Sequence, residues 1–239
     1  MQKPADPESA DTKEKRFKPE IAVKGETYLR IPIRTHIVTE KDDLLDIVKN
    51  YAIPKCVKGD VLLVGHKVAA AAQGRIVPIA SFKPRWIARF ITKFVWKPAS
   101  KNLGTKPAWR MEIIIRQIGY PRFIAALMAS VATKPFGVKG IFFKVIGRDA
   151  TVIDGPVSYN LPPFNTSITL APENPNGVAK SIKEKFGISA AIVDANDLGI
   201  DLLGKSDDSI DENWVREVFK DNPLGQAREQ TPMCIVRKI

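Results

Sequence analysis

The chain has 239 residues, 44% of them hydrophobic and 26% charged. This is an ordinary globular composition, so a chain that is mainly disordered, collagen-like or a bare coiled coil is excluded. No apolar run reaches the roughly 18–20 residues that a membrane span needs. Cys56 and Cys234 are too far apart in sequence to suggest a disulfide framework or a thiolate metal site. With no apolar signal segment at its start, the sequence predicts a cytoplasmic protein.

Positive charge is concentrated in the middle of the chain. The formal net charge is +11, yet residues 75–148 hold 15 Lys and Arg and a single acid, Glu112. A cationic block of this kind attracts polyanions such as nucleic acid, anionic lipid headgroups or nucleotide phosphates. It also serves solubility alone, and the sequence leaves both interpretations open.

The first third of the chain predicts a tail followed by a folded domain. Residues 1–20 are polar and highly charged, which predicts a disordered tail, and residues 21–239 are expected to form one domain. Within it, residues 21–38 begin to alternate as a strand does, and residues 44–51 have helical spacing. Residues 61–64 (VLLV) predict a buried strand after a Gly-Asp turn.

Residues 84–96 predict an amphipathic helix with an aromatic face and a basic face. The aromatic residues recur every four positions: Phe82, Trp86, Phe90 and Phe94. Such a helix can lie on an anionic membrane, or it can pack its apolar face into a core. We favour packing into the core, because a single such helix in a globular chain usually faces inward.

The remaining elements predict a mixed α+β fold without internal repeats. We expect a long irregular loop over residues 154–175, which are rich in Pro, Asn and Ser. The predicted helices cover residues 111–118 and 123–131 (broken at Gly119–Pro121), 177–186 and 211–219. The predicted strands cover residues 140–146, 151–153, 188–193 and 231–237.

Residues 199–206 formally match the phosphate-loop pattern GxxxxGK[ST]. A true phosphate loop follows directly on a strand and has small residues that leave its amides free for phosphate. Here the preceding strand ends near Val193, bulky Ile200 and Leu202 fill the loop, and Asp201 adds a negative charge. The pattern therefore predicts a strand or turn with an incidental match.

Asp194, Ala195, Asn196 and Asp197 come at the end of a predicted buried strand. Carboxylates and an amide at such a position can hold a hard divalent cation, or they can form an Asx turn, and the residues alone do not decide. Asp154 in a Gly-Pro turn and the polar segment 222–232 with Glu229 are weaker signals of the same kind. His36 and His66 have no metal-ligand spacing and are interpreted as structural.

Four segments of the chain, in order and with matching spacing, resemble the gamma-glutamyl ligases of deazaflavin biosynthesis (coenzyme F-420:L-glutamate ligase). The resemblance extends over roughly residues 30–239. The segments are Gly59–Val64 with Gln73–Ile76, Ser167–Gly177, Val193–Asn196, and Leu224–Val236. The family resemblance implies the mixed α+β fold of those enzymes.

The resemblance also implies an activity and a set of site residues. The expected reaction is GTP- or ATP-dependent ligation of L-glutamate or a similar amino acid to a carboxylate acceptor, with Mg²⁺ or Mn²⁺. It assigns Asp154, Asp194 and Gln226 to the metal, and Asn196 and Gln226 to the nucleotide, with Asp197 and Glu229 as further nearby carboxylates. It assigns no catalytic residue, and it implies a homodimer.

Two departures from the family pattern leave the acceptor open. The family's Lys and Glu before the Gly-Arg-Ile segment are replaced within Ala69–Ala72 and at Gln73, and its Gly-Arg after the Asn is replaced by Asp197 and Leu198. The alternative function is a non-catalytic module that binds nucleic acid or an anionic membrane through the basic block 75–148.

Overall fold

The computed structural model describes residues 17–95, 107–138, 140–147, 152–156, 160–196, 199–225 and 229–239. Its main sheet has the strand order β1-β2-β9-β3-β7-β8, with β3 and β7 parallel and the other neighbours antiparallel. The strands are β1 (Glu20–Val23), β2 (Glu26–Ile33), β3 (Val61–Gly65), β7 (Ser189–Asn196), β8 (Gly199–Lys205) and β9 (Met233–Lys238). This confirms the mixed α+β fold class.

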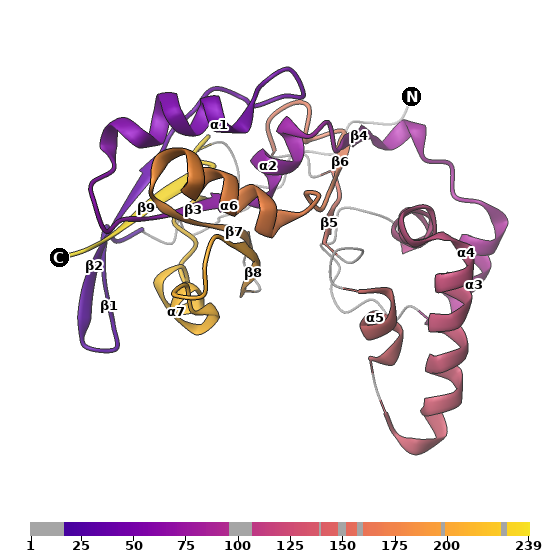
Figure 1. Ribbon diagram of the computed structural model, residues 1–239. Helices are drawn as coiled ribbons and strands as arrows, with labels where there is room; N and C mark the ends of the chain where they lie inside the picture. Colours follow the sequence, from indigo (N-terminus) through magenta and orange to yellow (C-terminus); the bar gives the residue numbers. More distant parts are fainter. Residues whose placement is uncertain are drawn as a thin grey trace, which may run out of the picture.

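Helices cover both faces of the main sheet because its central strands are apolar on both sides. On β3, Leu62 and Val64 pack with α2 and α6, whereas Leu63 points to the opposite face and packs with α7. Figure 1 shows α1, α2 and α6 on one side of the sheet and α7 on the other. The elements are α1 (Leu44–Ile47), which continues through η1 (Val48–Ala52) and η2 (Ile53–Lys55), α2 (His66–Ala72), α6 (Pro175–Phe186) and α7 (Glu212–Val218).

A second sheet connects this body to a lobe of helices (Figure 1). Its strand order is β4-β6-β5, and a short η3 (Ile79–Ser81) leads from it into the helices. The strands are β4 (Ile76–Pro78), β5 (Ile153–Asp154) and β6 (Ser167–Leu170). The helical lobe, defined here as the described residues between 82 and 147, contains α3 (Trp86–Val95), α4 (Pro107–Thr133), η4 (Lys134–Phe136) and α5 (Ile141–Ile146). Phe123, Phe142 and Ile168 belong to the core that joins the lobe to the second sheet.

The structure corrects one predicted strand in the lobe and confirms the predicted break. Residues 140–146 are not a strand, because α5 spans Ile141–Ile146 and buries Phe142 and Ile146, four residues apart, on one helical face. The Phe142 ring meets Phe123 edge-on at 5.6 Å between centroids. The break between the two predicted helices is confirmed, since Gly119 inside α4 has the positive φ of 74°.

The helix predicted over residues 84–96 is present as α3, but the prediction that its aromatic face packs inward was wrong. Ala88 and Ile91 are buried, whereas Trp86 is 76% exposed and Phe90 54% exposed. With 3.6 residues per turn, Ala88 and Ile91 lie on one face and Trp86 and Phe90 lie on the opposite face. Trp86 and Phe90 therefore lie on the outer surface of this helix, whereas Phe82, which precedes it, is buried.

The phosphate-loop match is a strand, as predicted. Residues 199–205 form β8, and the second glycine of the pattern has a packing role. A Cβ on Gly204 would lie 2.3 Å from the Pro175 carbonyl carbon, so only glycine lets the start of α6 approach β8 this closely. The Lys205 amide donates to Asn176 Oδ1 at 2.9 Å, which ties the same two elements together.

The first described residues lie against β2 near a buried arginine. The Arg30 amide donates to the Pro19 carbonyl at 2.7 Å, and residues 1–16 of the expected tail lie outside the described residues. The Arg30 guanidinium is 1% exposed, donates to the Val218 carbonyl at 2.8 Å and pairs with both carboxylate oxygens of Asp221. This ion pair between the buried Arg30 and the partly exposed Asp221 links β2 to the segment that follows α7.

Candidate functional site

The site lies where the two parallel strands of the main sheet end. β3 and β7 run side by side up to the pair Gly65 and Val193, so the next residues along each strand, His66 and Asp194, come to the same edge. The Gly65 amide donates to the Pro232 carbonyl at 2.8 Å, which brings the segment before β9 to this edge as well. Carboxyl ends of parallel strands are where ligand sites in α/β sheets tend to form.

Charged side chains from four elements meet at this edge. His66 Nε2 lies 3.2 Å from Asp154 Oδ2, and His66 Nδ1 lies 3.5 Å from Asp194 Oδ1. Lys67 Nζ lies 3.1 Å from the same Asp154 oxygen. Arg110 of α4 is near enough for both carboxylates to affect its pKa. We call His66, Lys67, Arg110, Asp154 and Asp194 the ionic cluster.

Neighbouring charges shift the pKa values of Asp154, His66 and Arg110. Burial by itself would raise the pKa of Asp154, but the contact with His66 and the charge of Lys67 lower it well below its usual range. Burial would likewise lower the pKa of His66, yet Asp154 and Asp194 outweigh it and raise that pKa. For Arg110, burial lowers the pKa while the two carboxylates oppose the shift. The cluster therefore favours an ionised Asp154 and a protonated His66.

One polar atom of the cluster has no hydrogen bond. His66 is 3% exposed, and its Nε2, although 3.2 Å from Asp154, is buried and is not aligned for a hydrogen bond with any described atom. We therefore regard its contact with Asp154 as an ion pair of poor hydrogen-bond geometry. In the protonated ring this buried N–H can still donate a hydrogen bond to a ligand atom.

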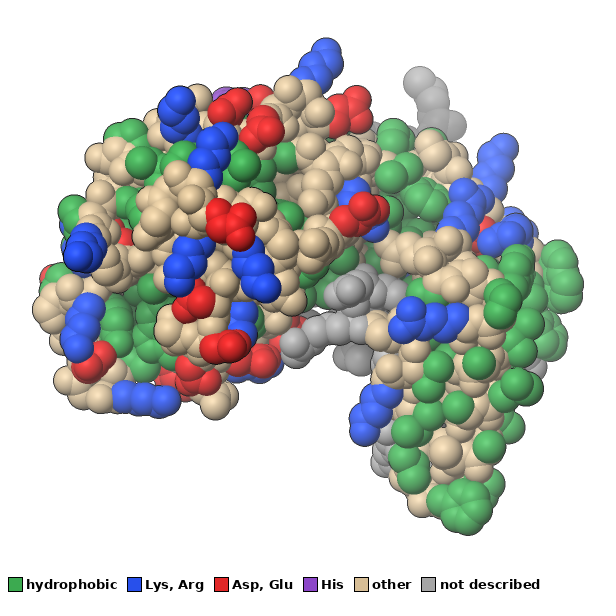
Figure 2. All heavy atoms as spheres, in the orientation of Figure 1, with side chains coloured by type: hydrophobic (Ala, Val, Ile, Leu, Met, Phe, Trp, Pro, Cys, Tyr) green, Lys and Arg blue, Asp and Glu red, His purple; other side chains and the backbone are tan. Residues whose placement is uncertain are grey.

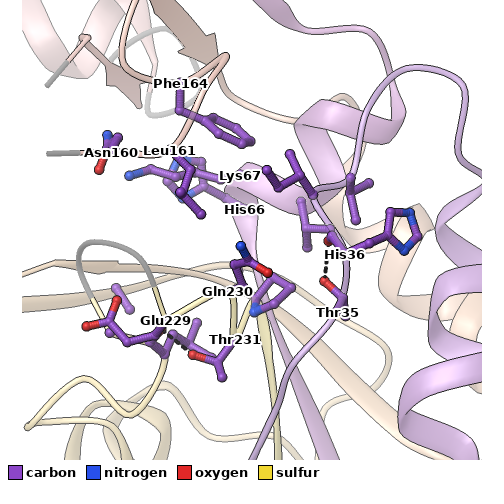
Figure 3. Close-up of a pocket in the computed structure, with 18 of the residues that line it drawn as sticks. Thr35, His36, His66, Lys67, Asn160, Leu161, Phe164, Glu229, Gln230 and Thr231 are labelled. Carbon is purple, nitrogen blue, oxygen red and sulfur yellow. Dashed lines mark hydrogen bonds between the residues drawn. The ribbon is translucent and has the colours of Figure 1, made fainter. Parts of the chain in front are cut away.

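His66 and Lys67 also line a cavity of about 170 Å³. Figure 3 shows them between the segment that carries Asn160 and Phe164 and the segment that carries Glu229 and Thr231. Asp154 and Asp194 thus contact two residues of the pocket wall. The cavity is lined both by charged side chains such as Lys67 and Glu229 and by apolar ones such as Phe164, as small-molecule sites are.

Two of the predicted metal ligands lie on either side of the His66 ring. Asp154 and Asp194 contact opposite nitrogens of His66, and Glu229 lines the adjoining cavity. Gln226 and Asp197 lie outside the described residues, as does the side chain of Asn196 at the end of β7. Among the residues that the structure describes, no group of three or more His, Cys, Asp and Glu has the geometry of a metal site.

Sequence reasoning missed three residues of the ionic cluster. His66 was interpreted as structural, and it is buried, but it lies between the two carboxylates. His66 and Lys67 come directly after the apolar strand VLLVG, just as Asp194 comes directly after ISAAIV. This shared position at the end of a strand was the signal that could have identified both residues. Arg110 gave no such signal, because a half-buried arginine on a helix resembles any other in the basic block.

The mixed α+β fold thus places the ionic cluster and an adjoining pocket at the ends of two parallel strands. The model of the family described as F420-0:Gamma-glutamyl ligase matches residues 32–193, more than half of the chain. The chain belongs to this family, and its fold is consistent with it. Family membership supports a ligase-type function on small-molecule substrates. A comparison with curated proteins found no match.

We expect His66→Gln to lower the free energy of unfolding by about 2–3 kcal/mol, because it leaves Asp154 and Asp194 without the cation between them. Urea unfolding at neutral pH measures the loss. The matched control is His36→Gln, since His36 is exposed and pairs with Asp42 at 3.0 Å, so its loss should stay below about 0.5 kcal/mol. Equal losses in the two variants would contradict a buried counter-ion role for His66.

Proposed function

We propose that this protein is a nucleotide- and divalent-cation-dependent ligase that joins L-glutamate or a similar amino acid to a carboxylate acceptor. The observation that carries the proposal is the convergence of Asp154 and Asp194 at the ends of parallel strands, next to three basic side chains, in a chain of this ligase family. An acid–amine ligation needs both kinds of charge, because oxygen ligands hold the cation and basic groups offset the phosphates.

Asp154 and Asp194 are the proposed ligands of Mg²⁺ or Mn²⁺. Their ionised carboxylates are hard oxygen donors and fit such a cation in chemistry. Gln226 is proposed as a third ligand and Asn196 as a nucleotide contact, both by family resemblance. Gly225 and Glu229, which flank residues 226–228 in the sequence, line the cavity beside His66. When bound, the cation would neutralise phosphate charge.

The basic residues of the ionic cluster are proposed to hold the phosphates. In the structure, Lys67 and His66 are occupied by Asp154. A divalent cation on the carboxylates would take over that pairing and leave Lys67 free for phosphate oxygens. Cation and nucleotide would then bind together, each making the site more favourable for the other. Arg110 would add positive charge from the helical lobe.

The proposed chemistry has two steps. The acceptor carboxylate attacks the terminal phosphate of GTP or ATP, giving an acyl phosphate and the nucleoside diphosphate. The amino group of the amino acid then attacks the acyl carbon, forms the amide bond and releases inorganic phosphate and a proton. Lys67, His66 and Arg110 would stabilise the negative charge that builds up on the transferred phosphoryl group.

The acceptor is proposed only as a small carboxylate-bearing molecule. Where the family has a glutamate, Gln73 exchanges two hydrogen bonds with the backbone of Glu173, at 2.7 and 3.1 Å, and thus supports a turn. Ala69, Ala70 and Ala71 are buried. At these positions the family's Lys and Glu are replaced by residues that pack or support a turn. We therefore propose that the acceptor differs from the family's deazaflavin. A homodimer is proposed by family resemblance, and analytical ultracentrifugation would test it.

Titration calorimetry with GTP and with ATP tests the proposal. In the presence of Mn²⁺ or Mg²⁺ we expect one of the two nucleotides to bind, and removing the cation with a chelator should weaken binding at least about tenfold. The same titration with a nucleoside monophosphate is the control, since it lacks the phosphates that the cation would bridge. No binding of either nucleotide with either cation would contradict the proposal.

A further inference from the structure

The helical lobe exposes a continuous apolar stripe along the second half of α4. Tyr120, Ile124, Met128 and Val131 are spaced three or four residues apart, so they lie on one side of the helix. Met128 is 63% exposed and Val131 is 64% exposed. Phe136, directly after this helix, is 81% exposed. Large apolar side chains gathered in this way mark an interaction surface.

The outer face of α3 extends this surface and adds charge to it. Trp86 and Phe90 are exposed next to Arg89 and Lys93, which are exposed on the same side of the helix. The Arg85 guanidinium lies 5.0 Å from the centre of the Tyr120 ring, which joins the start of α3 to the stripe on α4. We call these side chains of α3 and α4, with Phe136, the outer lobe surface.

The acid of the lobe is hidden from this surface. Glu112 is fully buried, and its Oε1 accepts from Arg85 Nε at 2.8 Å and from Arg116 Nε at 2.9 Å. Among the described residues of the lobe, the charges that remain exposed are therefore basic. In Figure 2 the lobe shows hydrophobic side chains along its outer edge and tip, with Lys and Arg nearby.

We infer that the outer lobe surface binds the surface of an anionic lipid bilayer. Exposed Trp, Phe and aliphatic side chains enter the headgroup region, while Lys and Arg pair with anionic lipids. No described helix is long and apolar enough to cross a membrane, so the lobe would lie on the bilayer. The inference concerns a surface away from the ionic cluster and stands independently of the ligase proposal.

Two other occupants fit the surface less well. Nucleic acid would match the positive charge, but Ile124, Met128 and Val131 cannot stack on bases as aromatic rings do. A second copy of the chain would bring the basic residues of two lobes, such as Arg89 and Lys93, close to each other without acids to pair them. An anionic bilayer supplies both the missing apolar contact and the missing negative charge.

Vesicle co-sedimentation of the full chain tests the inference. We expect binding to vesicles of equal parts phosphatidylglycerol and phosphatidylcholine, and at least about tenfold weaker binding to pure phosphatidylcholine or at high salt. Trp86→Ser and Met128→Ser should each weaken binding about tenfold. The control is Val57→Ser, which removes a half-exposed apolar side chain from the main body and should leave binding unchanged.

Charge-reversal variants separate the electrostatic component of vesicle binding from the apolar component. Arg89→Glu with Lys93→Glu should abolish the preference for anionic vesicles, whereas Lys220→Glu, an exposed charge next to α7, should not. Three results would overturn the inference: no sedimentation with anionic vesicles, equal binding by the Trp86 and Val57 variants, or self-association that Trp86→Ser abolishes. Tighter binding to a single-stranded oligonucleotide than to the vesicles, lost in the same variants, would assign the surface to nucleic acid instead.

Discussion

Replacing Asp154 or Asp194 with asparagine is expected to weaken cation-dependent nucleotide binding at least about 100-fold. Asparagine keeps the shape of the side chain but removes the negative charge that would hold Mg²⁺ or Mn²⁺. Both carboxylates contact His66 at the ends of the parallel strands, so each variant removes one proposed ligand. Calorimetry with the nucleotide and Mn²⁺ measures the change, and product formation should fall with it.

Asp201→Asn is the matched control for this experiment. Asp201 lies directly opposite Asp194 in the register of β7 and β8, but its carboxylate is half exposed and pairs with Arg216 at 3.0 Å. We expect this variant to bind nucleotide as the original protein does. Circular dichroism would verify that all three variants are folded. Unchanged binding in folded Asp154 and Asp194 variants would remove the two aspartates from the cation site.

The second large effect is expected at the ion pair between the buried Arg30 and the partly exposed Asp221. Asp221→Asn should lower the free energy of unfolding by about 3–5 kcal/mol, because the guanidinium of Arg30, which is 1% exposed, would lose its counter-ion. Urea unfolding at neutral pH measures this. Glu217→Gln removes an exposed pair with Lys220 and should cost less than about 1 kcal/mol.

The loss in the free energy of unfolding caused by Asp221→Asn should become smaller as the pH falls. Burial would raise the pKa of Asp221, but the hydrogen bonds and charge of Arg30 lower it below the ordinary value. A group whose pKa is lowered on folding contributes stability above its unfolded pKa, about 4, and loses it as the pH falls through the folded value. The difference between Asp221→Asn and the original protein should therefore shrink below about pH 4. A pH-independent difference would contradict an ionic origin.

The sequence predicted the main sheet well and the helical lobe less well. Strands such as β3 are short apolar runs between turn signals, and buried strands in a mixed sheet have this appearance. GIFFKVI has the same appearance, yet residues 141–146 form α5, whose Phe142 packs against Phe123 of α4, and a short apolar run alone does not distinguish a buried strand from such a helix. Similarly, β6 lies inside the predicted loop 154–175, since four residues among Pro and Asn carry little periodicity.

The sequence of α3 did not predict which of its faces packs inward. Both of its faces carry large apolar side chains, and which one packs inward is decided by its contacts with α4. The contacts of the candidate site could not be predicted from local sequence patterns either. The order of Asp154 and Asp194 along the chain was visible, but their meeting at His66 depends on a parallel pairing of β3 with β7 that no local pattern encodes.

A crystal soaked with Mn²⁺ and GTP or ATP tests the central claim most directly. Anomalous scattering locates manganese without reference to any assumed site. We predict a manganese peak within bonding distance of carboxylate oxygens of both Asp154 and Asp194, with nucleotide phosphates beside Lys67. Manganese and nucleotide bound elsewhere, with both aspartates still paired to His66, would contradict the claim.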